Sequence, residues 1–318
     1  MTGVFKKIKK SAIIKTIYYK KSEKHVIRLK NIGRQHYYII RRPAPGGGFF
    51  SNWIWVLAHI CYAKKHDYIC VVDQQNYLTE YTEDHPINDV TNVWEYYFNQ
   101  PGNASLAEAY ASKNYILSDD AIHSDELPYS EPSANKFVLD DNKLKQVCKI
   151  ANENIKLNKN IQKLLDEKWK SIKIGNEKET IVGVHVRQTD KIIPPTGHYA
   201  ASDTEQYFVE IDKILHDCPS AKIFLCCDDL RTIECFKAHY GSCVFYNDAY
   251  RAEPGSTTGI HLDKIYHREN HKYLLGVEVI MDAYMLARCD YLIHTHSNVT
   301  NAAIIINGGR YRKRVFVG

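Results

Sequence analysis

The chain has 318 residues, of which 44% are hydrophobic and 25% charged, and its formal net charge is +5. This composition is that of a globular protein and excludes a disordered or fibrous chain, and the length suits two domains with cores of their own. There is no apolar run of about 18 residues, so we expect no membrane-spanning helix. Mild basicity suits anionic small molecules, nucleic acids or acidic membrane surfaces.

The basic excess is partly local, because lysines crowd the first 24 residues. A solvated N-terminus is the simpler interpretation, and peripheral contact with the inner face of an anionic membrane is the alternative. The opening MTGVFKKIKK has no apolar segment after its charges, unlike a secretory signal. The 9 cysteines lack the close pairs of zinc sites and suit reduced thiols. We therefore expect a cytoplasmic protein.

The first domain, which we place at 1–172, opens with a βαβ unit. Residues 37–42 (YYIIRR) predict a strand, and 43–52 (PAPGGGFFSN) a loop, because proline and glycine disfavour regular structure. Apolar residues at helical spacing predict a helix at 53–66, and 68–73 (YICVVD) predict a second strand. Weakly periodic sequence follows, where we expect short helices and long loops. A polar helical region at 142–172, interrupted near 157–160, ends this domain.

The second domain, placed at 173–318, alternates strands with helices, which predicts a parallel sheet covered on both faces. We expect Gly241 to end one helix and Ser297 or Asn298 to cap the last. The two domains together predict an α/β protein with two Rossmann-like domains facing a cleft. The expected strands are 181–187, 221–229, 243–247 and 290–296, and the expected helices are 203–218, 230–241, 273–289 and 297–307.

Polar residues gather where these strands end, which is where open parallel sheets bind ligands. His185 and Arg187 end one strand, and 294–297 (HTHS) end another. The guanidinium of Arg187 can hold two phosphate oxygens at once, and an ion pair with Asp190 is the structural alternative. His185 alone would be a hydrogen-bonded core residue, but beside Arg187 it is a candidate nucleotide contact. Asp228 can either accept from guanine donors or cap the following helix.

The glycine-rich loop GGGFFSN can present backbone N–H groups to an anion at a helix start. It is not a P-loop, because no Gly-Lys-Ser/Thr follows, and Phe49 to Asn52 break the GxGxxG pattern. The alternative is a turn without a ligand.

Three segments in order resemble the signature motifs of the α1,6-fucosyltransferase family. The segment 183–191 (GVHVRQTDK) is similar to its His-x-Arg-Arg-Thr-Asp-Lys signature, and 223–229 (IFLCCDD) to its strand that ends in Asp-Asp. The segment 276–304 is similar to its third motif, an Asp-bearing helix, a strand and a Ser-rich turn. The loop 46–59 (GGGFFSNWIWVLAH) corresponds more loosely to the family's N-terminal glycine turn.

The resemblance implies a glycosyltransferase-B fold, GDP-L-fucose as donor, inversion at the anomeric carbon and no metal. It implies that Arg187 holds the β-phosphate while His185 and Asp228 meet the guanine. Without a cation, the departing diphosphate needs fixed positive charge and N–H donors, which Arg187, Lys191 and the glycine loop can supply. The candidate residues are Arg187, Lys191 and Asp190 for catalysis and His185, Arg187, Asp228, Asp282, Ser297, Asn298, Gly47, Gly48 and Asn52 for the donor, with no metal ligands.

Two positions depart from the family pattern. Gln188 replaces the second arginine of the signature, and Pro195 replaces a carboxylate proposed to deprotonate the acceptor hydroxyl. An inverting transfer usually needs a base within hydrogen-bond reach of the acceptor oxygen. The sequence does not choose among the nearby candidates Asp190, His198, Asp203 and Glu205.

The leading hypothesis is an inverting, metal-independent fucosyltransferase that moves L-fucose from GDP-fucose to a hydroxyl of a carbohydrate acceptor. One alternative is a glycosyltransferase for another GDP- or UDP-sugar, and another is a non-catalytic nucleotide- or glycan-binding module, which Pro195 supports best. We expect no nucleic-acid partner, since no RNP-like or zinc motif accompanies the lysines. The acceptor would lie against the first domain, where 94–98 (WEYYF) either stacks on sugar rings or, more simply, packs in the core.

Overall fold

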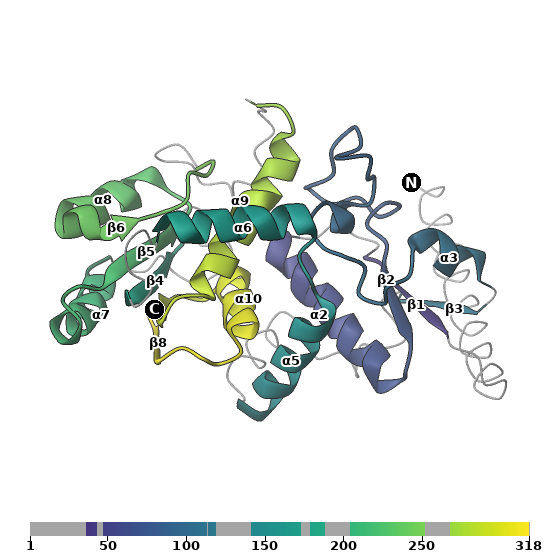
Figure 1. Cartoon of the computed structure of the whole chain (residues 1–318), viewed down its shortest axis with the longest axis horizontal. Helices are drawn as coiled ribbons and strands as arrows, with labels where there is room; N and C mark the ends of the chain where they lie inside the picture. The colour runs from purple at the N-terminus through teal and green to yellow at the C-terminus, as the bar shows by residue number, and fades with distance from the viewer. Residues whose placement is uncertain are drawn as a thin grey trace, which may run out of the picture.

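The computed structural model describes residues 36–42, 47–112, 114–118, 141–172, 179–187, 204–251 and 268–317. Two parallel sheets lie toward opposite ends of an elongated molecule (Figure 1). Four helices lie between them: α2 (Phe49–Lys65), α5 (Asp141–Asn154), α9 (His271–Leu286) and α10 (Asn298–Asn307). One sheet has three strands and the other has five. The predicted α/β class with two parallel sheets is confirmed.

The first sheet has the order β2-β1-β3, with all strands parallel. Its central strand β1 (Tyr37–Ile40) is followed by α2 (Phe49–Lys65) and then by β2 (Ile69–Val72), which is the expected βαβ unit. The third strand, β3 (Tyr115–Leu117), lies in a region where we expected only short helices and loops. Its three residues are too short to show a period of two, and it forms because β1 offers an open edge.

Helix α2 begins at Phe49, not at Trp53, so the predicted loop is wrong over its last four residues, Phe49 to Asn52. Gly48 is the N-cap, and the side chains of Phe49 and Phe50 are 9% and 2% exposed. Burying a phenylalanine contributes about 1.5–3 kcal/mol, which offsets the weak helix signal of this segment. Tertiary burial therefore decides where the helix starts.

Between β2 and β3 the chain forms η1 (Val93–Tyr96) and α3 (Leu106–Ala111), which begins with a capping box made by Ser105 and Glu108. In the segment 94–98, the side chains of Trp94, Tyr96, Tyr97 and Phe98 are at most 4% exposed. These aromatic residues belong to the core, as the simpler interpretation expected.

The second sheet has the order β6-β5-β4-β7-β8, again all parallel. Residues Val182, Val184 and Val186 of β4 pack against the apolar faces of α7 and α8. The alternate face packs against α9 and α10. Gly241 ends α8 with φ +61°, which confirms the expected cap. The strands are β4 (Ile181–Val186), β5 (Lys222–Cys227), β6 (Val244–Phe245), β7 (Tyr291–His294) and β8 (Lys313–Phe316). The helices are α7 (Thr204–Asp217), α8 (Leu230–Tyr240), η2 (Gly241–Cys243), α9 (His271–Leu286) and α10 (Asn298–Asn307).

One hydrophobic cluster joins the two halves, since it contains Ile40 and Val72 of the first sheet as well as Phe224 and Leu292 of the second. Helix α5 (Asp141–Asn154) packs on both α2 and α10, and α6 (Lys159–Ile172) packs on α9. These two helices, which we assigned to the first domain, therefore also contact the second. The boundary at residue 172 stays a prediction.

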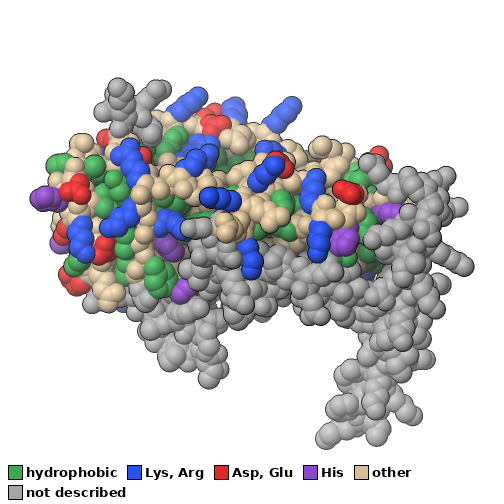
Figure 2. Space-filling view, turned by 90° about the horizontal axis from the view of Figure 1, so that it is seen from below, with side chains coloured by type: hydrophobic (Ala, Val, Ile, Leu, Met, Phe, Trp, Pro, Cys, Tyr) green, Lys and Arg blue, Asp and Glu red, His purple; other side chains and the backbone are tan. Residues whose placement is uncertain are grey.

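On the face seen in Figure 2, the Lys and Arg side chains of the described residues are spread along the molecule and are not gathered in one patch. Within the ranges that the structure describes, no helix is both long and apolar enough to cross a membrane. The lysine-rich N-terminus lies outside the described residues.

Candidate functional site

Strands β5, β4 and β7 lie side by side and end at the same edge of the second sheet. His185 of β4 is in register with Cys226 of β5 and with His294 of β7. The three side chains therefore form a row on one face of the sheet. Gly183 lies two residues before His185 and therefore on the same face of β4. A Cβ on Gly183 would lie 3.0 Å from the Sγ of Cys289, which follows α9, so this face is the one toward α9.

His185 and Arg187 lie at the end of this central strand. His185 is 5% exposed, and Arg187, the first residue after β4, is half-buried. Arg187 therefore sits at the carboxyl edge of the sheet, between the ends of β5 and β7, where an arginine can reach a bound anion. Its role toward phosphate stays a prediction.

The two neighbouring carboxylates at the end of β5, Asp228 and Asp229, have different structural roles. Asp229 is the N-cap of α8: its side chain accepts from the backbone N–H groups of Arg231 (3.1 Å) and Thr232 (3.3 Å) and from the hydroxyl of Thr232 (2.8 Å). Asp228 is half-buried and is not the cap. The capping alternative for Asp228 is therefore wrong, because the next residue occupies that position.

We expect Asp229→Ala to lower the free energy of unfolding by about 1 kcal/mol through loss of the cap, and to leave guanine-nucleotide affinity unchanged. Asp228→Ala is expected to have the smaller effect on unfolding and to abolish GDP binding. Urea denaturation and calorimetric titration with GDP measure the two effects on both variants. Unchanged GDP affinity in Asp228→Ala would remove Asp228 from the donor site.

Asp282 of α9 lies beside the same row. Its Oδ2 accepts from the Sγ of Cys226 (3.3 Å), and its Oδ1 accepts from the Nδ2 of Asn247 (2.6 Å). Burial raises the pKa of Asp282, against the opposing effects of these two hydrogen bonds and the nearby charge of Arg251. The carboxyl group is thus fixed next to the strand ends by neutral donors, at the α9 face where His185 also lies.

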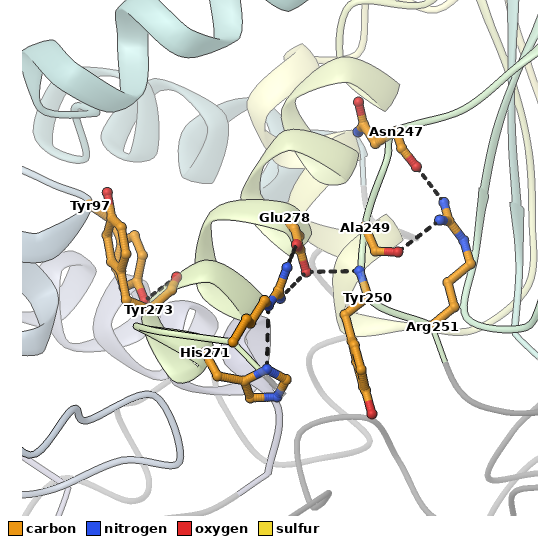
Figure 3. A network of polar contacts seen from close by, with 9 residues as sticks. Tyr97, Asn247, Ala249, Tyr250, Arg251, His271, Tyr273 and Glu278 are labelled. Carbon is orange, nitrogen blue, oxygen red and sulfur yellow. Dashed lines mark hydrogen bonds and ion pairs between the residues drawn. The ribbon is translucent and has the colours of Figure 1, made fainter. Parts of the chain in front are cut away.

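Asn247 is itself positioned by a buried arginine. Arg251 is 9% exposed, and its guanidinium donates to the backbone carbonyls of Asn247 (2.6 Å) and Ala249 (3.0 Å) (Figure 3). These bonds curl the segment after β6 back on itself and present the Asn247 side chain to Asp282.

A second arginine holds that segment against α9. Arg268 forms a two-pronged ion pair with Glu278 (2.5 and 3.0 Å) and donates to the Nδ1 of His271 (3.3 Å). Glu278 also accepts from the backbone N–H of Tyr250 (3.1 Å) (Figure 3). The sequence analysis missed Asn247, Arg251, Arg268 and Glu278. None of the three motifs contains Asn247, Arg251 or Arg268. Glu278 lies within the third motif, one helical turn before Asp282, and this position was the one sequence signal for it.

Ser297 and Asn298 form the turn after β7. The Ser297 hydroxyl accepts from the backbone N–H of Val299 (3.2 Å), so the expected cap of α10 is confirmed. Asn298 is the first residue of that helix and is half-buried. Nearby, burial lowers the pKa of His294 to about 4, which keeps its imidazole neutral at neutral pH. The donor contacts expected of Ser297 and Asn298 stay predictions.

The glycine turn lies at the carboxyl end of β1, in the first domain. Gly47 has φ +63°, a conformation that favours glycine, and a Cβ on Gly48 would meet no atom of the described residues within 4 Å. Asn52 is 7% exposed, and its Oδ1 accepts from the Nη1 of Arg42 (2.8 Å). Among the described residues nothing crowds Gly48, while Asn52 is held by an arginine that the sequence analysis did not single out.

Two adjoining hollows lie beside this turn. The first is shallow and is lined by Arg41, Arg42 and residues of α2, β2 and the segment after β2. The second is lined mainly by aromatic residues between Phe49 and Phe98. Asn52, Gln74 and Thr79 line both hollows. All lining residues belong to the first half of the chain, so these hollows are distinct from the strand-end row of the second sheet.

Several predicted residues lie outside the described part of the chain: Gln188, Asp190, Lys191, Pro195, His198 and Asp203. Glu205 is exposed in the first turn of α7. The choice of catalytic base therefore stays open. Across the described ranges, no group of three or more His, Cys, Asp or Glu side chains is arranged to hold a metal ion.

Comparison with known proteins identifies a family for this chain. The family model described as alpha-(1,6)-fucosyltransferase N- and catalytic domains matches residues 145–303, half of the chain. Among curated protein sequences, none matches this chain significantly.

Among solved structures, the chain is similar to the α1,6-fucosyltransferase NodZ soaked with GDP-fucose, with 16% identity and a TM-score of 0.48 over 86% of this chain and 93% of that one. NodZ from Bradyrhizobium gives 15% identity and 0.47 over 85% and 93%. POFUT1 in complex with GDP gives 12% identity and 0.47 over 89% and 99%. The match of the family model to half of the chain, at the strands and turns described above, shows that the protein is a glycosyltransferase that belongs to the α1,6-fucosyltransferase family.

Proposed function

We propose that this protein transfers L-fucose from GDP-fucose to a hydroxyl group of a carbohydrate acceptor, with inversion at the anomeric carbon and without a metal ion. The proposal depends on the positions of His185, Arg187 and Asp228. These residues lie at the ends of two neighbouring strands of one parallel sheet, within the segment that matches the family. Ligands of open parallel sheets bind at this edge. Family membership supports fucose as the transferred sugar.

The main chemical requirement is stabilisation of the leaving diphosphate. The acceptor oxygen forms a bond to the anomeric carbon, the bond from that carbon to the β-phosphate oxygen breaks, and the acceptor proton passes to a base. Negative charge then builds on GDP. A guanidinium at Arg187 can hold two phosphate oxygens, and backbone N–H groups at the Gly47–Gly48 turn can add neutral donors. Lys191 stays part of the proposal as a further cation.

The nucleoside end of the donor would lie over the α9 face. There His185, neutral donors and the buried carboxyl of Asp282 offer hydrogen-bonding groups in a desolvated setting. Such groups discriminate strongly among bases, because an unmatched buried polar group is costly. We propose that the enzyme works in the cytoplasm, with contact between its lysine-rich N-terminus and the inner membrane face as the alternative to a solvated N-terminus.

The direct test is to incubate the protein with GDP-fucose and EDTA and to follow the release of GDP. We expect slow hydrolysis without acceptor, with released fucose first appearing as the anomer opposite to that of the donor by NMR. GDP-mannose and UDP-galactose serve as donor controls. Preference for either control would support the alternative donor, while GDP binding without turnover toward any acceptor would support a non-catalytic module.

A further inference from the structure

The carboxyl group of Asp282 is held by two side chains from other parts of the second domain. Its Oδ1 accepts from the amide Nδ2 of Asn247, which follows β6, at 2.6 Å, and its Oδ2 accepts from the Sγ of Cys226 at 3.3 Å. An ionised carboxyl group has about four acceptor positions, so these two bonds leave acceptor positions for the N–H or O–H groups of a ligand. Asp282 is half-buried and is therefore not fully enclosed by the fold.

The amide of Asn247 is the stronger of the two donors to Asp282. A thiol is a weak donor, and the bond from Cys226 is the longer one. An amide N–H that donates to a carboxylate forms a charge-assisted bond. Because Asn247 is only 4% exposed, its amide has little freedom to move, and it fixes the direction in which the other acceptor positions of Asp282 point.

Arg251 holds Asn247 in this position. Its guanidinium donates to two backbone carbonyls, those of Asn247 (2.6 Å) and Ala249 (3.0 Å) (Figure 3). The Cζ of Arg251 also lies 5.2 Å from the centre of the Tyr246 ring. A lysine could not form both bonds in one plane. The turn that brings Asn247 to Asp282 therefore depends on this arginine.

The charge of Asp282 depends on these neighbours. Burial raises the pKa of Asp282, and the hydrogen bonds from Asn247 and Cys226 and the charge of Arg251 lower it. The charge of Glu278, one turn earlier on α9, raises it. Removing the amide donor would leave the effect of burial less opposed, so the carboxyl group would take up a proton at a higher pH.

The other titratable and charged groups on this side of the second sheet are the pair Glu278 and Arg268, the thiol of Cys226, and the imidazoles of His185 and His294. Glu278 and Arg268 form an ion pair (2.5 and 3.0 Å). Burial raises the pKa of the Cys226 thiol and lowers the pKa of His294 to about 4. These last two side chains therefore do not change charge near neutral pH.

We propose that Asn247 is a positioning residue of the donor site: its amide holds the Asp282 carboxylate in the orientation that accepts from the bound sugar nucleotide, and Arg251 holds Asn247 in place. The inference rests on the proposed function and adds a residue that lies outside the three motifs. Without the amide, the carboxyl group can turn away or take up a proton, which replaces an acceptor position with a donor. Asn247 therefore acts on nucleotide affinity through Asp282.

Asn247→Leu removes the amide and keeps roughly the same side-chain volume. We expect it to weaken GDP binding by about tenfold or more in calorimetric titration with EDTA, because hydrogen bonds to charged groups are the stronger ones. The KM for GDP-fucose should rise by a similar factor while kcat changes less, since Asn247 does not touch the reacting atoms. The matched control is Asn154→Leu, because Asn154 is 8% exposed and its amide donates to the carbonyl of Ile150 within α5 (2.8 Å). This control should bind GDP as the wild type does.

A double variant tests whether Asn247 acts through Asp282. Asp282→Asn is expected to weaken GDP binding, and Asn247→Leu/Asp282→Asn should lose no more affinity than Asp282→Asn alone. Additive losses would mean that Asn247 affects the nucleotide by another route, and they would overturn the positioning role.

Asn247→Asp gives a readout that a merely structural role would not move. The new carboxyl group would lie at the position of an amide that is 2.6 Å from Asp282, and two carboxyl groups this close share one proton. The protonated group donates to Asp282 as the amide does, and the ionised group repels it. GDP affinity, divided by that of the wild type at the same pH so that titration of the nucleotide cancels, should therefore recover from about pH 8 to about pH 6. Asn247→Leu should show the opposite trend, because the raised pKa of Asp282 removes the ionised acceptor as pH falls.

Urea denaturation first establishes that each variant is folded, and Asn247→Asp, which has the same shape as the wild type, decides the question if Asn247→Leu is not. Wild-type GDP affinity in Asn247→Leu, or no recovery of Asn247→Asp on acidification, overturns the positioning role and leaves the fucosyltransferase proposal standing. A folded wild-type protein that binds no GDP overturns the proposed donor, and the positioning role with it.

Discussion

Arg187→Ala is expected to lower kcat/KM with GDP-fucose by about 10²–10³-fold, the range seen when one preorganised donor is removed from a developing oxyanion. The residue follows β4 at the carboxyl edge of the five-stranded sheet and is half-buried there. Arg187→Lys should recover only part of the loss, because an ammonium group cannot form the two parallel bonds of a guanidinium.

Calorimetric titration of GDP in the presence of EDTA measures the binding part of this effect, and steady-state rates measure the rest. Arg312→Ala is the matched control, since Arg312 lies just before β8 of the same sheet, where it is 55% exposed and pairs with Asp290 (3.2 Å). We expect the control to bind GDP as the wild type does. Wild-type affinity and rate in Arg187→Ala would show that the phosphates bind elsewhere.

Gly276→Ala is expected to destabilise the protein by about 3 kcal/mol or more, although alanine is the better helix former by about 1 kcal/mol. The new Cβ would overlap the Oη and Cζ atoms of Tyr97, a residue of the first domain that is 1% exposed. Tyr97 cannot move aside, because its ring stacks on Tyr273 at 5.6 Å and its hydroxyl donates to the Tyr273 carbonyl (3.1 Å) (Figure 3).

Urea denaturation of the single variants Gly276→Ala and Tyr97→Phe and of the double variant tests this contact. Because the Tyr97 hydroxyl is the nearest atom to the new Cβ, the double variant should be more stable than the sum of the two single losses predicts. A Gly276→Ala protein as stable as the wild type, or more stable, would mean that helix propensity outweighs packing at this seam between the domains.

The second sheet shows what local sequence can determine. Strands β4 and β5 are continuous apolar runs, and two later helices of the same domain, α8 and α10, have recognisable caps at Gly241 and Ser297. Each of these signals acts over a few residues, so it can be read without the fold. The strand-end rule then brings His185, Arg187 and Asp228 to one edge, because parallel strands with right-handed crossovers end on the same side.

Family membership also followed from local sequence, since the three motifs lie within contiguous segments. Residue-level roles were harder to predict. The sequence does not show which of Asp228 and Asp229 caps the following helix. Only the backbone direction at the start of α8 makes Asp229 the cap. Asn247 meets Asp282 across 35 positions of the chain, which no local pattern reports.

The sequence by itself determined the α/β class, most elements of the second domain, the family and the candidate donor residues, because these depend on periodicity, caps and contiguous motifs. Only the tertiary structure decided that α2 begins at Phe49, that β3 and β8 exist, and that Arg41 and Arg42 share a hollow with Trp55 and Tyr77. The physical reason is that burial, edge pairing and charge clustering depend on neighbours far apart in the chain, and their free energies exceed the small differences in local propensity.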